Sequence, residues 1–255
     1  MPKVSLLREE LLHPIYVANI ESSVHRKREG PKYSHYISHG FRIQDTANLD
    51  SVLPTRGAVD GFVFQVGQYE NPFSSIKMID DYAKCMGIKA LIHIRLAPEN
   101  HAKFLCEENH VANRAVESLV GAMRSQRVKV FLDTFMDLDR GYFPRIGLYD
   151  RWLNPRKSSN VMRHLMGILK TLCSGIELDA VSQRDGWRFY TFHSSEQRFG
   201  LLLPQINMER KGLDLDLEEF SGSEIIDLET GRSTYLSDIE SRFDIRDTQY
   251  LILFP

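Results

Sequence analysis

Hydrophobic and polar residues follow two different periods along the first 172 residues of the chain. Short apolar runs of strand length occur at residues 14–20, 59–66, 89–96 and 128–135. Apolar residues recur at helical spacing over 71–86, 108–126 and 161–172. Strands that alternate with amphipathic helices predict a parallel sheet whose strands are joined by helical crossovers.

The helix predicted over residues 71–86 has the clearest start and stop. Asn71 opens it and Pro72 takes its first position, where the N–H that proline lacks has no partner in any case. Gly87 follows the last apolar residue, and glycine often ends a helix in the left-handed conformation. We expect the methionines of the predicted helices to fill the core, namely Met78, Met86 and Met123.

From about Gly175 the period changes to that of strands alone. Apolar runs at 187–195, 198–206, 223–229 and 248–254 are separated by turn residues. This pattern predicts a small antiparallel β-sandwich. We therefore expect two domains, a (β/α)-barrel domain over 1–174 and a sandwich over 175–255.

The number of strands limits the barrel. A closed eight-stranded TIM barrel takes about 250 residues and rarely fewer than about 200. The chain offers 172 residues with four or five strands before the pattern changes. Half a barrel leaves open sheet edges and an apolar face, which proteins normally cover. The sequence therefore predicts a partial TIM-type barrel that is compensated within the chain, or is completed by a partner chain or in a homo-oligomer.

Composition and charge limit the classes of partner that we expect for this protein. Hydrophobic residues make up 42% of the chain and charged residues 26%, as in ordinary globular proteins. The formal net charge of −2 gives no reason to expect nucleic acid or an acidic membrane surface as a partner. No apolar run has the roughly 18 residues of a membrane span, and the first residues lack a signal-peptide pattern. The three cysteines form no C-x-x-C pair, so we expect a cytoplasmic protein without structural zinc.

Charged and aromatic residues concentrate at 133–156, after the fourth predicted strand. Sites of (β/α) folds lie beyond the carboxyl ends of the strands, because the βα-loops converge there. Carboxylates, arginines and aromatic rings together suit a sugar, which has paired hydroxyls and apolar faces. The residues we single out in this stretch are Asp133, Asp137, Asp139, Arg140, Tyr142 and Arg145. The alternative is that these charges form ion pairs that hold a long loop.

Other charged groups stand near the ends of other predicted strands. Glu21 follows the first strand and is a possible general acid or base, while the basic residues at 25–28 suit an anion or a solvated surface. His93 and Arg95 alternate along the third strand, so their side chains point to the same side. We expect Arg95 to contact ligand, whereas His93 also fits a hydrogen-bonded core histidine. The D-x-D pair at 137–139 lacks the rest of a calcium loop, so no metal is expected.

Two turn motifs carry a family resemblance. One reads G-L-Y-D at 147–150 followed by N-P-R at 154–156, and the other reads D-L-E-T-G at 227–231. Both resemble motifs near the end of barrel glycoside hydrolases, where the last strand leads into a final helix and a small β-sandwich. More narrowly, residues 13–255 resemble the D-apionate lactonase family, through the strand before Glu21, the unit around Pro72, the I-R-L-A-P-E segment at 94–99 and the loop after Asp133.

The sequence also departs from that family. The family's N-terminal β-domain and first barrel strands have no counterpart in it. Retaining members of the wider clan use two carboxylates, and Glu21 matches the acid/base position. The strand that should carry the nucleophile reads L-I-H-I-R-L-A at 91–97, without an acidic residue.

The resemblance and the residues together imply a carbohydrate-active hydrolase, either a glycosidase or a sugar lactonase, that needs no cofactor. The expected catalytic residues are Glu21, Asp133 and Asp137. The expected substrate-binding residues are Arg95, Asp139, Arg140, Tyr142 and Arg145, which would hold a carbohydrate or sugar acid. Two alternatives stay open: a non-catalytic half-barrel subunit that docks onto a partner, and a sugar-binding protein without turnover.

Overall fold

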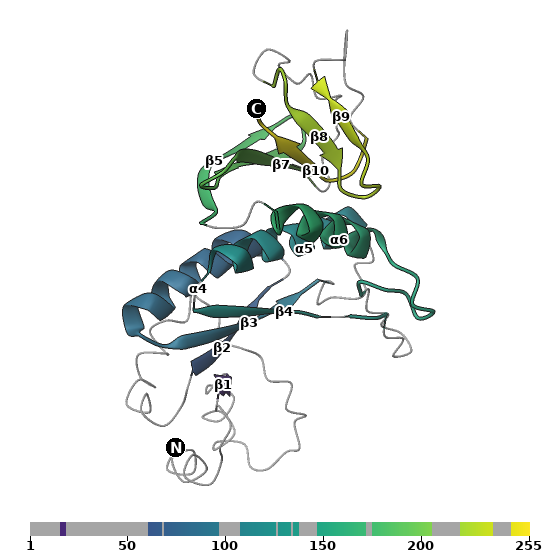
Figure 1. Ribbon diagram of the computed structural model, residues 1–255. Coiled ribbons are helices and arrows are strands. Elements are labelled where there is room, and N and C mark those ends of the chain that lie inside the picture. The colour runs from purple at the N-terminus through teal and green to yellow at the C-terminus, as the bar shows by residue number, and fades with distance from the viewer. Residues whose placement is uncertain are drawn as a thin grey trace, which may run out of the picture. The chain divides into compact units, whose positions relative to one another are not determined.

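The computed structural model describes residues 16–18, 61–67, 69–96, 108–125, 127–133, 135–137, 147–171, 175–205, 220–236 and 246–255. Its contacts divide the chain into two compact units. The first unit comprises residues 1–95 and 125–133, and the second comprises 96–124 and 134–255. Each unit contains one sheet (Figure 1). A domain boundary after residue 174 stays a prediction.

The sheet of the first unit has four strands in the order β1-β2-β3-β4. The strands are β1 (Tyr16–Ala18), β2 (Gly61–Val66), β3 (Lys89–Arg95) and β4 (Val128–Asp133). All three neighbouring pairs run parallel. The parallel sheet predicted from the strand–helix alternation is therefore confirmed.

Helix α4 (Pro72–Met86) joins β2 to β3. The Asn71 side chain accepts a hydrogen bond from the Ser74 backbone N–H at 2.9 Å, which satisfies one of the unpaired donors of the first turn. Gly87 ends the helix with φ of 63°, a conformation that costs glycine no Cβ clash. Both ends of the helix lie where the sequence predicts them.

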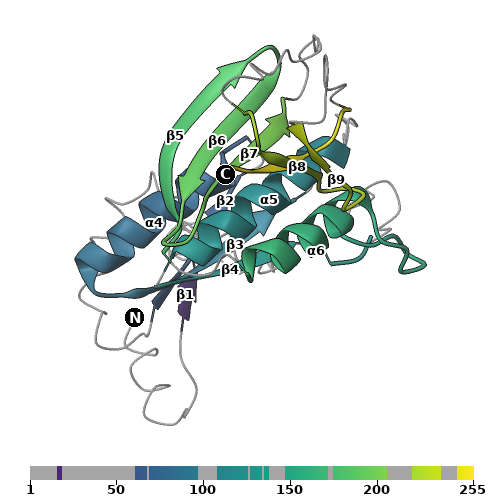
Figure 2. The ribbon, with the colours of Figure 1, turned by 45° about the horizontal axis from the view of Figure 1, so that its top comes forward.

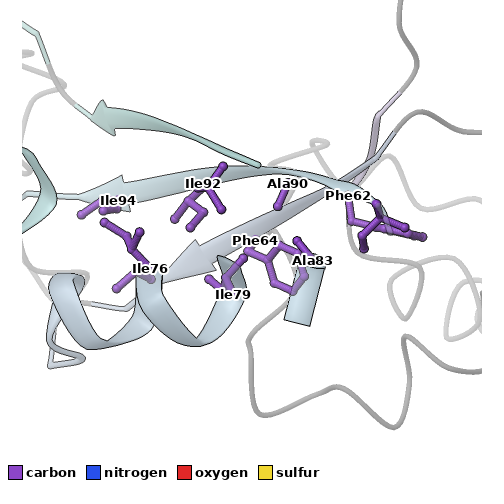
Figure 3. Packing of buried hydrophobic residues seen from close by; sticks show 11 residues of the cluster. Phe62, Phe64, Ile76, Ile79, Ala83, Ala90, Ile92 and Ile94 are labelled. Atoms are coloured by element: carbon purple, nitrogen blue, oxygen red, sulfur yellow. The ribbon is translucent and has the colours of Figure 1, made fainter. Parts of the chain in front are cut away.

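Helix α4 packs against one face of the parallel sheet, as Figure 3 shows. Ile76, Ile79 and Ala83 of the helix contact apolar side chains of the strands. The strand residues in this cluster are Phe62, Phe64, Val66, Ala90, Ile92, Ile94 and Val128. Since successive side chains of a strand point to opposite faces, residues 63, 65, 91, 93, 95, 129, 131 and 133 face away from α4.

The methionines do not all follow the prediction. Met86 packs against the core cluster of the first unit. Met78 and Met123 are exposed, so their assignment to the core is wrong. Both methionines lie outside the buried stripes of their helices, so their apolar character alone was a poor guide to their burial.

The second unit contains a six-stranded antiparallel sheet in the order β5-β6-β7-β10-β8-β9. Figure 2 labels strands β5 to β9 of this sheet, and Figure 1 labels β10. The strands are β5 (Glu177–Arg184), β6 (Trp187–His193), β7 (Arg198–Pro204), β8 (Glu224–Asp227), β9 (Ser233–Tyr235) and β10 (Tyr250–Leu253). The antiparallel pairing predicted after residue 175 is confirmed. A sandwich requires a second facing sheet, and the described residues of this unit form one sheet, so the sandwich stays a prediction.

Helix α5 (Glu108–Arg124) is fastened to this sheet by a polar stripe. Asn109, Asn113 and Glu117 stand four residues apart and therefore share one face of the helix. Asn113 donates to the Pro204 carbonyl at 2.6 Å and accepts from the Gln249 side chain at 2.8 Å. These contacts connect a helix of the strand–helix region with the C-terminal strands.

Glu117 is the charged residue of the stripe and forms a buried ion pair. Its side chain is 4% exposed, and its carboxylate accepts hydrogen bonds from the Tyr190 hydroxyl at 2.7 Å and from Arg188 at 2.8 Å. Burial alone would lower the pKa of Arg188, but the neighbouring Glu117 and Tyr190 raise it overall. The paired charges therefore hold α5 against β6.

His110, on the same helix, makes stability depend on pH. Burial, helped by the positive charge of Arg114, lowers the pKa of the imidazole from 6.5 to about 4. As the pH falls, His110 therefore binds a proton near pH 6.5 in the unfolded chain, but only near pH 4 in the folded chain. We expect this group to remove about 3 kcal/mol of the free energy of unfolding as the pH falls across that window. Urea unfolding at pH 7 and pH 4.5 checks this, and an unchanged pH dependence in His110→Gln would contradict it.

Helix α6 (Lys157–Leu169) holds the turn between β8 and β9. The His164 imidazole contacts the Leu228 carbonyl through Nδ1 at 2.8 Å. Within the turn, Asp227 accepts hydrogen bonds from the backbone N–H groups of residues 229 and 230. Gly231 has φ of 74°, and a Cβ at this position would lie 2.9 Å from the His164 ring. The D-L-x-T-G motif therefore encodes a tight turn and a close contact with α6.

Alanine substitutions at two glycines should have opposite effects. Gly231→Ala is expected to lower the free energy of unfolding by about 1–2 kcal/mol, since it forces a left-handed conformation and crowds His164. Gly167→Ala serves as the control, because this glycine lies inside α6 with nothing within 4 Å of its Cβ position. That change is expected to raise stability by about 0.5–1 kcal/mol. Thermal unfolding of both variants measures the difference, and equal effects would contradict the role of the turn.

Candidate functional site

The candidate site lies on the face of the parallel sheet that points away from α4, which we call the distal face. It comprises Val63, Gln65, Leu91, His93, Arg95, Lys129, Phe131 and Asp133. Three of these stand near the carboxyl ends of β3 and β4, at the edge where (β/α) folds place their sites: His93, Arg95 and Asp133. Polar groups therefore gather at the end of the sheet where chemistry is expected.

Asp133 and His93 form the central contact of the distal face. His93 Nε2 lies 3.5 Å from Asp133 Oδ2, and both side chains are partly exposed. The strand register places Arg95 directly beside Asp133. An aspartate that contacts a histidine, with an arginine in register beside it, is thus built from two adjacent strands. Sequence reasoning expected Asp133 and Arg95 to belong to the site, and the structure brings these two together.

Gln65 extends this group onto β2. It pairs in register with His93, and its side chain is 3% exposed. Its Nε2 atom is buried and has no hydrogen-bond partner in the described part of the chain. Sequence reasoning missed this residue, although a glutamine that alternates with Phe64 and Val66 in a buried strand was visible as an unusual polar position.

An aromatic ring lies beside the polar group. Phe131 pairs in register with His93 on the opposite side from Gln65, and its side chain is 53% exposed. Exposed aromatic rings suit the apolar faces of sugars. The distal face therefore combines hydrogen-bonding groups with an apolar surface.

In the second unit, Asp137 is occupied by contacts within its own loop. Its carboxylate accepts hydrogen bonds from the Gly147 backbone N–H at 2.8 Å and from the Arg156 guanidinium. Its own N–H donates to the Tyr149 carbonyl at 2.8 Å. The hydrogen bond with Asp137 raises the pKa of Arg156, with further help from Glu108. These contacts fit the alternative in which the charges of the stretch hold a long loop.

The turn that follows explains the G-L-x-D motif. The Asp150 carboxylate accepts hydrogen bonds at 2.8 Å from the backbone N–H groups of Trp152 and Asn154 and from the Asn154 side chain. The hydrogen bond with that side chain is the main reason why the pKa of Asp150 is lowered. Gly147 comes so close to the backbone of Met136 that a Cβ would lie 2.7 Å away. The motif therefore encodes the turn before α6.

The remaining predicted site residues lie outside the described residues, namely Glu21, Asp139, Arg140, Tyr142 and Arg145. Among the residues that the structure describes, no group of three His, Cys, Asp or Glu side chains is arranged to hold a metal ion. No helix in the described ranges is long and apolar enough to cross a membrane.

The distal face can bind and polarise an oxygen-rich ligand. Asp133 and His93 have side chains of the types that act as general acids and bases, so they can exchange a proton with a ligand or a water molecule. Arg95 can stabilise a carboxylate or the negative charge that develops on a carbonyl oxygen. Such an arrangement suits hydrolysis at a carbonyl carbon.

Comparisons with known proteins bear on the fold. No protein-family model matches the chain, and no curated protein matches it in sequence. A family 39 glycoside hydrolase from the gut symbiont Bacteroides cellulosilyticus WH2 has a similar structure, with a TM-score of 0.52 at 11% sequence identity. The likeness covers 81% of this chain and 47% of that chain, so the chain spans less than half the length of that hydrolase. The chain thus has a glycoside-hydrolase-like fold.

A second solved structure aligns over a longer stretch with a lower score. It is a maltogenic alpha-amylase from Thermotoga neapolitana. The alignment covers 98% of this chain and 73% of the amylase chain, at 11% sequence identity. Its TM-score of 0.31 is too low for it to carry an argument about this chain.

Proposed function

We propose that the chain belongs to a carbohydrate-active hydrolase related to the D-apionate lactonases and hydrolyses the lactone of a sugar acid. The observation that carries the proposal is the contact between His93 and Asp133, 3.5 Å long, at the carboxyl edge of the parallel sheet with Arg95 in register beside it. The glycoside-hydrolase-like fold supports a carbohydrate as substrate.

The reaction is the addition of water to the lactone carbonyl. Asp133 and His93 take a proton from the water as its oxygen bonds to the carbonyl carbon, and Arg95 stabilises the resulting oxyanion. The bond from the carbonyl carbon to the ring oxygen then breaks, and that oxygen receives the proton. The product is the open hydroxy acid. A carboxylate that contacts an imidazole, with an arginine in register beside it, supports this reaction. The glycosidase mechanism with retention would instead need a second carboxyl group at about 5–5.5 Å.

The other expected residues keep supporting roles in the proposal. Glu21 supplies a second proton-transfer group, and Asp139, Arg140, Tyr142 and Arg145 contribute substrate contacts. Asp137 acts through the loop, because Gly147 and Arg156 already occupy its carboxylate.

The proposal includes a TIM-type barrel that this chain supplies in part. Strand β4 is the last strand of the sheet order in the described residues, and Phe131 is exposed on it. A parallel sheet is normally covered on both faces. We propose that further polypeptide, either a partner chain or a second copy, completes the barrel on this side. If that partner carried the catalytic groups, the chain would be the non-catalytic half-barrel subunit.

Hydrolysis of a panel of sugar lactones and aryl glycosides by the purified full chain tests the proposal. Acid release monitored by pH-stat should occur with at least one sugar lactone, and the aryl glycosides should remain intact. Light scattering on the same preparation reports whether the active species is a monomer or an oligomer. Glycoside cleavage without lactone hydrolysis would favour a glycosidase instead. Binding without any turnover would favour the sugar-binding alternative.

A further inference from the structure

We propose that the side-chain amide of Gln65 is a ligand-binding group of the distal face and donates a hydrogen bond to an oxygen of the bound sugar acid or lactone. The inference rests on the proposed function, since it assigns a new contact to the same site. It adds a third strand, β2, to a site whose other groups come from β3 and β4.

The burial of Gln65 is the first argument. Its side chain is 3% exposed, and its Nε2 atom has no hydrogen-bond partner among the described residues. A buried amide without a partner forfeits the hydrogen bonds that it makes with water in the unfolded chain. Such groups are rare in native proteins and call for an explanation, which a ligand oxygen provides.

The position of Gln65 is the second argument. It lies in register with His93, whose Nε2 contacts Asp133. The three residues therefore follow one another across neighbouring strands of one sheet face. Strands fix the position of a side chain more tightly than loops do, so the amide is held ready for its acceptor.

The chemistry of the neighbours defines the ligand. An amide N–H needs an acceptor oxygen, such as a hydroxyl, a carbonyl or a carboxylate. His93, Asp133 and Arg95 add groups that also require a polar and oxygen-rich partner. A hydroxylated acid or its lactone satisfies all four side chains, whereas an apolar ligand would leave Gln65 buried without a hydrogen bond.

The test separates binding from folding. Gln65→Met keeps the length of the side chain and removes the amide, so the ligand-free protein should melt at the same temperature or higher. Its affinity for the probe should fall about tenfold, the loss of one hydrogen bond. The probes are glucono-1,5-lactone and D-gluconate, with affinity measured by calorimetry and stability by thermal unfolding.

Thr248→Val is the matched control. Thr248 is also buried, and its hydroxyl has no hydrogen-bond partner in the described part of the chain. It belongs to the second unit, whereas the residues of the distal face belong to the first. This variant should be at least as stable as the unmodified protein, with unchanged affinity. Gln65→Glu provides a second variant of the same shape, which replaces the donor by an acceptor and should also lose affinity.

Two failures can be told apart. If the unmodified chain binds a probe and both Gln65 variants bind it equally well, the inference is overturned while the proposed function stands. If the unmodified chain binds neither probe, the result contradicts a sugar acid or its lactone as the ligand. Both the proposed function and the role of Gln65 are then overturned. A loss of affinity in Thr248→Val as large as in Gln65→Met would also overturn the inference, because the effect would then not be local.

Discussion

Replacing Glu117 with alanine is expected to lower the free energy of unfolding by about 3–5 kcal/mol. Its carboxylate is buried and accepts hydrogen bonds from Arg188 and from the Tyr190 hydroxyl. The substitution would leave the buried Tyr190 hydroxyl and the partly exposed Arg188 guanidinium without their shared acceptor. Removing one member of a buried pair therefore costs more than the pair contributes.

Urea unfolding of matched variants measures this effect. Glu108→Ala removes a carboxylate from the same helix that is exposed and pairs with Arg156 at 3.2 Å. Exposed ion pairs contribute about 0–1 kcal/mol, so this control should change little. Glu117→Gln keeps one acceptor oxygen and should fall between the two. Equal losses in Glu117→Ala and Glu108→Ala would mean that burial does not decide the strength of the contact.

Replacing Asp133 with asparagine is expected to lower kcat for lactone hydrolysis by about 10²- to 10⁴-fold, the range for loss of a proton-transfer group. His93→Asn should have a similar effect, because the two side chains act on the same proton. KM should change less than kcat in both variants, since asparagine keeps a hydrogen-bonding group for the proposed ligand and removes the group that transfers the proton.

The control for this prediction is Asp81→Asn. Asp81 is an exposed aspartate on α4, in the same unit as Asp133. Steady-state kinetics on the three variants, with thermal unfolding to confirm folding, give the comparison. If Asp133→Asn kept full kcat, the proton transfer would have to be assigned to other residues.

Local sequence signals predicted the elements of the fold well. Asn71, Pro72 and Gly87 define α4 because each acts on backbone atoms within four residues of itself. Short apolar runs located most of the strands for the same reason. The period of a strand or helix is a local property, so it can be read without knowing what the element packs against.

The attachment of α5 was not predictable in this way. Asn113 and Glu117 bind partners that are 136 and 73 residues away in the sequence. The sequence of the helix alone showed only an amphipathic pattern, which favoured packing on the neighbouring strands. The polar residues of its stripe carried no local sign that Gln249 and Tyr190 would be their partners.

The candidate site was predicted in part. Asp133 and Arg95 could be found, since position at a strand end and alternation along β3 are sequence features. His93 was weighed as a core histidine, and its contact with Asp133 depends on the register between two strands. Gln65 was missed because a single amide in an apolar strand forms no motif, and its burial and its unpaired Nε2 atom become known only from the structure.

The division of the chain has a consequence for experiments that cut or recombine it. The backbone passes between the two compact units three times, near residues 95, 124 and 133. A single protease cut at any of these crossings divides the chain into two pieces, and at least one compact unit then consists of residues from both pieces. Likewise, no single crossover point in a gene chimera can exchange one unit and keep the other intact. The end-to-end fusion of two separate domains therefore does not describe this chain. The segment 96–124, which contains helix α5, belongs to the second unit, but the sequence on both sides of it belongs to the first.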